Sequence, residues 1–110
     1  MTALSLSFIE ELSQRLGPVF HRYGVSRAIL FGSFARGEPS PRSDLDLILV
    51  QETEKRFLER YDGLLLELGK RVPDRDLDVL IYTAEELERI KDRAFVATAL
   101  REGKVIFESA

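Results

Sequence analysis

Four carboxylates lie in two short segments in which acidic and apolar residues alternate. Asp44 and Asp46 belong to the run DLDLILV, and Asp76 and Asp78 belong to DLDVLIY. Side chains two residues apart on a strand point to the same face, so each acidic pair would lie together opposite an apolar core face. Carboxylates that close repel each other unless a cation lies between them, and Mg²⁺ prefers such oxygen ligands. The pattern predicts a metal site, and a solvated sheet face is the alternative.

Gly32 and Ser33 directly follow a short apolar run that ends at Phe31. Small residues at this point let the backbone approach a ligand closely. If Ser33 opens a short helix that runs through Arg36, the backbone N–H groups at its start form an anion site. A simple turn after the strand is the alternative for this pair taken alone.

The first helix is expected from Ser7, which forms a capping box with Glu10, to Gly24. Its apolar residues recur at helical spacing. Pro18 lies inside this stretch and cannot donate to the carbonyl of Gln14, so the helix is expected to kink or to break in two there.

Three further helices are predicted by their start and stop signals. Thr53 caps the second, a capping box of Thr83 and Glu86 opens the third near Ala84, and Gly103 ends the last. The apolar residues expected on one face of the second helix are Phe57, Tyr61, Leu64, Leu65 and Leu68. The last helix is marked by Phe95, Val96, Ala99 and Leu100.

Strands are expected at residues 27–31, 44–50 and 76–82, with a short edge strand at 105–107. Because the helices and strands interleave, the sequence predicts an α+β fold with a small mixed sheet of about four strands and helices packed against it.

The composition excludes several classes of site and protein. The 110 residues predict a single domain, 1–110, and a net charge of -3 argues against long nucleic acid as the main ligand. The absence of cysteine excludes disulfides, thiolate zinc sites and cysteine nucleophiles, and it fits a cytoplasmic protein. No apolar run approaches the roughly 18 residues of a membrane span, and no signal peptide is expected.

The segment GSFARGEPSPRSDLDLILV, residues 32–50, closely resembles the signature of the DNA polymerase beta-type nucleotidyltransferase superfamily. That signature is Gly-Ser, ten residues and then Asp-x-Asp, and residues 34–43 provide the same spacing. The Ala35-Arg36-Gly37 insert, the Ser43-Asp44 step and the short chain are similar to the minimal nucleotidyltransferases, which are often paired with HEPN-domain toxins. The resemblance implies the minimal nucleotidyltransferase fold.

The resemblance also implies which residues contact the nucleotide. The phosphates of a nucleoside triphosphate would be held by Gly32, Ser33, Arg36 and Ser43. For Arg36 the favoured interpretation from the residues is nevertheless an ion pair with Glu38 or Asp44, because arginine pairs with carboxylates as readily as with phosphates.

Asp44 and Asp46 would, by the same resemblance, bind two divalent ions, Mg²⁺ or alternatively Mn²⁺. A third carboxylate from the later strand would complete the metal site or act as the general base. The family pattern favours Asp78 for this role, and Asp76, which shares its face, stays as the alternative.

The resemblance implies an enzyme that transfers AMP from ATP to a hydroxyl of a partner protein, as the antitoxin of a HEPN toxin pair. The alternative is a non-catalytic binding module that neutralises a HEPN ribonuclease by occlusion. A polymerase-like fragment is disfavoured by the acidic charge. The sequence leaves the acceptor, the base preference and the oligomeric state open, with a homo-oligomer among the alternatives.

Overall fold

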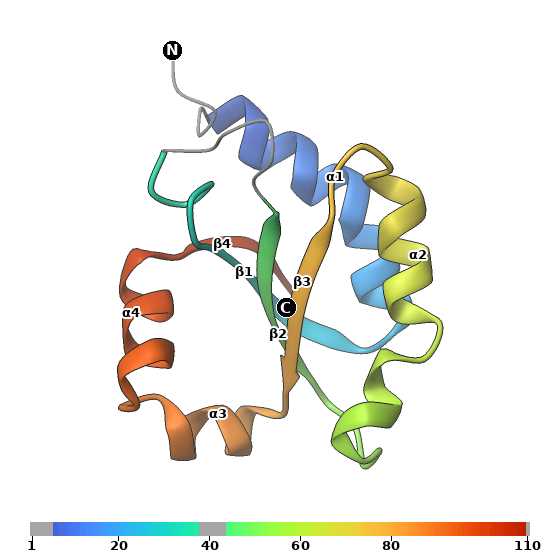
Figure 1. The fold of residues 1–110 in the computed structure, drawn as a ribbon. Helices are drawn as coiled ribbons and strands as arrows, with labels where there is room; N and C mark the ends of the chain where they lie inside the picture. Colours follow the sequence, from blue (N-terminus) through green and yellow to red (C-terminus); the bar gives the residue numbers. More distant parts are fainter. Residues whose placement is uncertain (1–5, 38–43, 110) are drawn as a thin grey trace.

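A four-stranded mixed sheet forms the centre of the computed structural model, which describes residues 6–37 and 44–109 (Figure 1). The strand order is β3-β2-β1-β4. β2 runs parallel to β3, whereas β1 is antiparallel to both β2 and β4. The predicted α+β class and mixed sheet are confirmed. The strands are β1 (Val25–Phe31), β2 (Leu45–Gln51), β3 (Leu77–Tyr82) and β4 (Lys104–Glu108).

Helices cover both faces of the sheet. On one side lie α1 (Leu6–Arg22), the short 3₁₀ helix η1 (Phe57–Tyr61) and α2 (Leu64–Arg71). On the other side lie α3 (Ala84–Ile90) and α4 (Ala94–Glu102) (Figure 1). None of the described helices is long and apolar enough to cross a membrane.

Alternation along β2 separates the main core from the face that carries the acids. Leu45, Leu47 and Leu49 are almost completely buried in the large cluster that α1 and α2 cover. Ile48 belongs to a smaller cluster on the opposite face, beneath α4. Asp46 has the same parity as Ile48 and therefore opens toward the α3–α4 side.

The first helix differs from its prediction at both its start and its proline. α1 is described from Leu6 onward, so Ser7 lies within the helix. Pro18 is accommodated within one continuous helix, so of the two expected alternatives, a kink or a break, the break is wrong. Leu16, Val19 and Phe20 around it are fully buried, and this packing offsets the hydrogen bond that proline cannot make.

The single helix predicted after Thr53 is also wrong, because the structure has η1 and α2 instead. Gly63 stands between them with φ 75°, a left-handed conformation that redirects the chain. Only part of the expected apolar face is buried: Leu64 is fully buried, whereas Leu65 is 40% exposed.

The signals in the C-terminal half are confirmed. The Thr83 hydroxyl accepts from the Glu86 N–H at 3.2 Å, and the Glu86 carboxylate accepts from the Thr83 N–H at 2.9 Å, which completes the capping box. Gly103 follows the last residue of α4. The strand predicted at 105–107 is present as β4, at one edge of the sheet.

Candidate active site

Asp46 and Asp78 lie directly opposite each other on the parallel strands β2 and β3. Both border the same cavity, so the predicted convergence of these two acids on one face is confirmed. Asp44 immediately precedes β2 and is exposed. Asp76 immediately precedes β3, where its carbonyl accepts from the Leu45 N–H at 2.9 Å.

Asp78 has a better position than Asp76 for a shared ligand. Both residues are exposed, but Asp78 is in register with Asp46 and lines the cavity, whereas Asp76 lies before the strand and does not line it. The backbone bond from Leu45 fixes the ends of β2 and β3 against each other just beside the acids. This geometry supports the choice of Asp78 as the third carboxylate.

Electrostatics at Asp46 oppose its ionisation. The pKa of Asp46 is raised, and burial is the largest cause. The negative charges of Asp78 and then Asp44 raise this pKa further, whereas the positive charge of Arg36 lowers it. A cation beside these carboxylates would relieve both the desolvation and the repulsion. The donors are all carboxylate oxygens, which suit a hard ion such as Mg²⁺ or Mn²⁺.

The protein alone supplies an incomplete ligand set. Within residues 6–37 and 44–109, no group of three acidic or histidine side chains converges closely enough to form a ready metal site. Mg²⁺ commonly completes its coordination with water and substrate phosphates. The residues therefore fit an ion that binds together with a phosphorylated ligand.

Gly32 brings the backbone against Asp46 at the end of β1. Its φ is 76°, and a Cβ at this position would lie 2.1 Å from Asp46 Oδ2. Only glycine fits this conformation and this close approach. The residue is thus required at the acidic end of the cavity.

The segment after Gly32 is a series of turns, so the short helix considered for Ser33 is not formed. The Arg36 N–H donates to the Gly32 carbonyl at 3.1 Å, and the Gly37 N–H donates to the Phe34 carbonyl at 3.2 Å. Gly37, with φ 76°, ends this series of turns within the described part of the chain. Ser33 is partly exposed beside Gly32.

Phe34 anchors this turn to the rest of the protein. It is 2% exposed, and its ring stacks on Phe8 of α1 at 5.5 Å between centroids. The Arg75 guanidinium lies 4.7 Å from the ring centroid, in a cation–π contact. These contacts hold the turn from α1 and from the segment that leads into β3.

The cavity beside the acids has a volume of 340 Å³, and α4 forms one of its walls. Four α4 residues at positions i, i+3, i+4 and i+7 line it, which places them on one side of the helix. Their contribution was missed from the sequence, where Phe95 was used only to mark the last helix, and Phe95 is 60% exposed. The lining residues are Phe31, Gly32, Arg36, Asp46, Asp78, Phe95, Thr98, Ala99 and Glu102.

Arg36 forms an ion pair with Glu102 across the rim of this cavity, with 3.7 Å between Nη1 and Oε1. Glu102 comes from α4 and was not among the partners considered from the sequence. Both side chains are partly exposed, so the pair is weak and exchangeable. The predicted site residue Ser43, and Glu38, lie outside the described residues.

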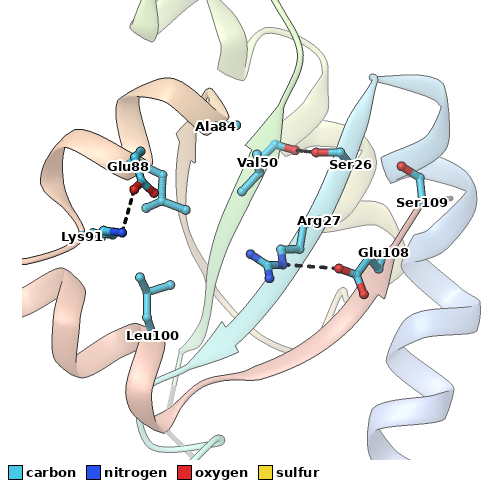
Figure 2. Close-up of a pocket in the computed structure, with 10 residues that line it drawn as sticks. Ser26, Arg27, Val50, Ala84, Glu88, Lys91, Leu100, Glu108 and Ser109 are labelled. Carbon is cyan, nitrogen blue, oxygen red and sulfur yellow. Dashed lines mark hydrogen bonds and ion pairs between the residues drawn. The ribbon is translucent and has the colours of Figure 1, made fainter.

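A second cavity of 450 Å³ lies near the opposite ends of β1 and β2 (Figure 2). Its charged groups pair with one another: Arg27 with Glu108 at 3.6 Å, and Lys91 with Glu88 at 2.7 Å (Figure 2). This pairing leaves no concentrated charge for a cation or a triphosphate. Although it is larger, this cavity is a poorer candidate for phosphate chemistry than the acidic one.

Comparison with known proteins matches most of the chain to one family. The family model described as "Polymerase beta, Nucleotidyltransferase" matches residues 14–110. A protein of Methanocaldococcus jannaschii named a "putative protein adenylyltransferase" is 38% identical over 76 residues, which cover 69% of this chain and 80% of the relative.

Solved structures share the fold. One described as a "putative minimal nucleotidyltransferase" is 30% identical with a TM-score of 0.62, covering 92% of this chain and 95% of that one. A chain in a structure of tri-AMPylated Shewanella oneidensis HEPN toxin in complex with MNT antitoxin has a TM-score of 0.57 at 14% identity, covering 92% and 73%. The chain described here belongs to the polymerase beta-type nucleotidyltransferase family, as one of its minimal nucleotidyltransferases.

Proposed function

We propose that residues 1–110 form a cytoplasmic nucleotidyltransferase domain that transfers AMP from ATP to a hydroxyl of a partner protein. The observation that carries the proposal is that Asp46 and Asp78 lie opposite each other on neighbouring strands and line one cavity together with Gly32. The cavity lining includes the exposed side chains of Arg36, Asp78 and Phe95, so the cavity is accessible to a hydroxyl presented by a second macromolecule.

The transfer replaces one phosphoester bond with another. The acceptor oxygen attacks the α-phosphorus, the bond from that phosphorus to the bridging oxygen breaks, and pyrophosphate leaves. In this assignment the Asp78 carboxylate takes the proton of the acceptor hydroxyl, as a general base. Gly32 and Ser33, with Arg36 and Ser43, contact the phosphates.

Asp44 and Asp46, with Asp78 beside them, would hold the divalent ions, Mg²⁺ or Mn²⁺. When bound, such ions neutralise the triphosphate and polarise its phosphoryl oxygens. The raised pKa of Asp46 supports this role, because uncompensated carboxylates at this place cost free energy. Arg36 can exchange its pairing with Glu102 for a phosphate oxygen, since both side chains are accessible.

The proposed partner is a HEPN toxin, which makes the protein an antitoxin. Support comes from the name of the archaeal relative, a protein adenylyltransferase, and from the structural neighbour in a complex that contains an AMPylated HEPN toxin. The neighbour is only 14% identical, so it supports a HEPN toxin as the partner only through the shared fold.

The direct test is label transfer. The protein is incubated with Mg²⁺, ATP labelled at the α-phosphate and a HEPN protein encoded beside it, and each chain is then examined by mass spectrometry. The expected result is the mass of AMP on the HEPN protein with wild type and none with Asp46→Asn. If wild type neutralises the toxin while no AMP is transferred, the proposal is wrong.

A non-catalytic binding module is the second candidate. It is favoured by exposed apolar side chains around η1 and α2, which are typical of interaction surfaces. Leu58 is 78% exposed and Leu66 is 65% exposed. A binder would need this kind of surface and no intact carboxylate site.

A further inference from the structure

Phe95 is an exposed aromatic side chain at the edge of the acidic cavity. It is 60% exposed, although it lies on the side of α4 that faces the cavity together with Thr98 and Ala99. Leaving a phenylalanine ring in water forfeits the stabilisation that its burial would provide. An exposed ring directly beside a candidate active site therefore suggests contact with a ligand.

The ring is also held in place. Its centroid lies 5.8 Å from that of Phe31, with an angle of 86° between the ring planes. Phe31 is 7% exposed and is the last residue of β1, immediately before Gly32. This edge-to-face contact fixes Phe95 against the sheet.

The cavity lining consequently combines two chemical kinds of side chain. Asp46 and Asp78 are acidic, while Phe31, Phe95 and Ala99 make an apolar and aromatic surface. The two parts of a nucleoside triphosphate match these two kinds of side chain. Its phosphates require metal ions, which the acids would hold, and its base has a flat π-face, which suits the aromatic surface. Aromatic side chains bind bases by stacking, with little dependence on base identity.

We infer that Phe95 is the platform on which the base of the nucleoside triphosphate stacks. This inference rests on the proposed function and adds the subsite for the base. In it Phe31 positions the ring of Phe95 and does not itself contact the base. The platform increases affinity for any nucleoside triphosphate and leaves the choice among bases to other groups.

The test compares Mg²⁺-ATP with Mg²⁺-tripolyphosphate, which has the charges but no base. Affinities are measured by calorimetry for wild type, Phe95→Ala, Phe95→Leu and Phe95→Tyr. Phe95→Ala and Phe95→Leu should weaken ATP binding by about tenfold to a hundredfold, while Phe95→Tyr retains most of it. Tripolyphosphate affinity should stay the same in all four proteins.

Leu58→Ala provides a matched control, since Leu58 is also exposed but lies on η1, away from the cavity lining. It should leave both affinities unchanged. Equal ATP affinity in wild type and Phe95→Ala would overturn the inference and leave the proposed function standing. The same holds if Phe95→Ala weakens tripolyphosphate binding as much as it weakens ATP binding. If wild type binds neither ligand with Mg²⁺, the proposed function and the inference are both wrong.

Discussion

Gly32 and Asp46 are in such close contact that no side chain fits between them: a Cβ on Gly32 would lie 2.1 Å from Asp46 Oδ2. The turn that follows β1 and the first acid of β2 therefore form one unit. Gly32→Ala must displace the Asp46 carboxylate and must also hold alanine at φ 76°. We expect it to reduce the free energy of unfolding by about 3 kcal/mol and to abolish metal-dependent ATP binding.

Gly37→Ala is the matched control, because Gly37 has the same φ of 76° but a Cβ there would have nothing within 4 Å among residues 6–37 and 44–109. It should cost only the backbone strain, about 1 kcal/mol, and retain ATP binding. Denaturant titration and calorimetry on both variants measure the two effects. Similar losses of binding in both would mean that strain alone, and not the contact with Asp46, is responsible.

Asp46→Asn should separate stability from function. The Asp46 carboxylate is partly desolvated and is repelled by Asp78 and Asp44, as its raised pKa indicates. Removing its charge without changing its shape should therefore raise the melting temperature of the metal-free protein, by on the order of a few degrees. The same change should eliminate Mg²⁺-dependent ATP binding. A lower melting temperature would show that the ionised carboxylate stabilises the fold.

The ion pair between Arg60 and Glu86 should make stability depend on pH in acid. The Arg60 guanidinium, 5% exposed, donates to both Glu86 oxygens at 2.6 and 2.9 Å. The hydrogen bonds from Arg60, and then that from the Thr83 backbone, lower the pKa of Glu86 from 4.5 to about 2. A lowered pKa stabilises the fold above pH 4.5 and loses this effect as the pH falls toward 2.

Glu86→Gln should therefore reduce the free energy of unfolding at pH 7 by about 2–3 kcal/mol, because it leaves Arg60 buried without its charged partner. The difference from wild type should shrink between pH 4.5 and 2. Glu88→Gln is the control, since its pair with Lys91 is at the surface and should contribute little. Chemical denaturation across this pH range tests both, and a difference that stays constant down to pH 2 would contradict the assignment.

Much of the fold could be predicted because the signals are local. The alternation in DLDLILV fixes which face of β2 carries Asp46, and the capping box at Thr83 and Glu86 starts α3 where expected. The site features that were missed depend on distant partners. The pairing of Arg36 with Glu102, and the use of α4 as a cavity wall, follow from packing that no local pattern encodes.

The errors have a similar origin. Pro18 can break a helix by itself, but buried neighbours such as Val19 and Phe20 keep α1 continuous. Phe95 belongs to the apolar pattern that predicts the last helix, yet it lines the cavity and is 60% exposed, while Val96 and Ala99 of the same helix are buried in the core. Helical periodicity identifies the side of a helix that faces the protein, but it does not distinguish a core from a cavity.

The final prediction distinguishes the enzyme from the binding module. Asp78→Asn removes the proposed general base, while Asp44 and Asp46 remain to bind metal and nucleotide. It should retain most ATP affinity but lose transfer by about 10²–10⁴-fold. Asp44→Asn should lose metal-dependent ATP binding as well as transfer.

These two variants can be compared with wild type in a toxicity rescue assay, with mass measurement of the HEPN partner from the same cells. An enzyme should rescue growth only when AMP is present on the partner, so Asp44→Asn and Asp78→Asn should both fail although they fold. An occluding binder should rescue equally well with either variant, because occlusion requires the surface around η1 and α2 and not the carboxylates. Full rescue by both variants, with no added AMP on the partner in any sample, would eliminate the enzymatic antitoxin and leave occlusion as the function.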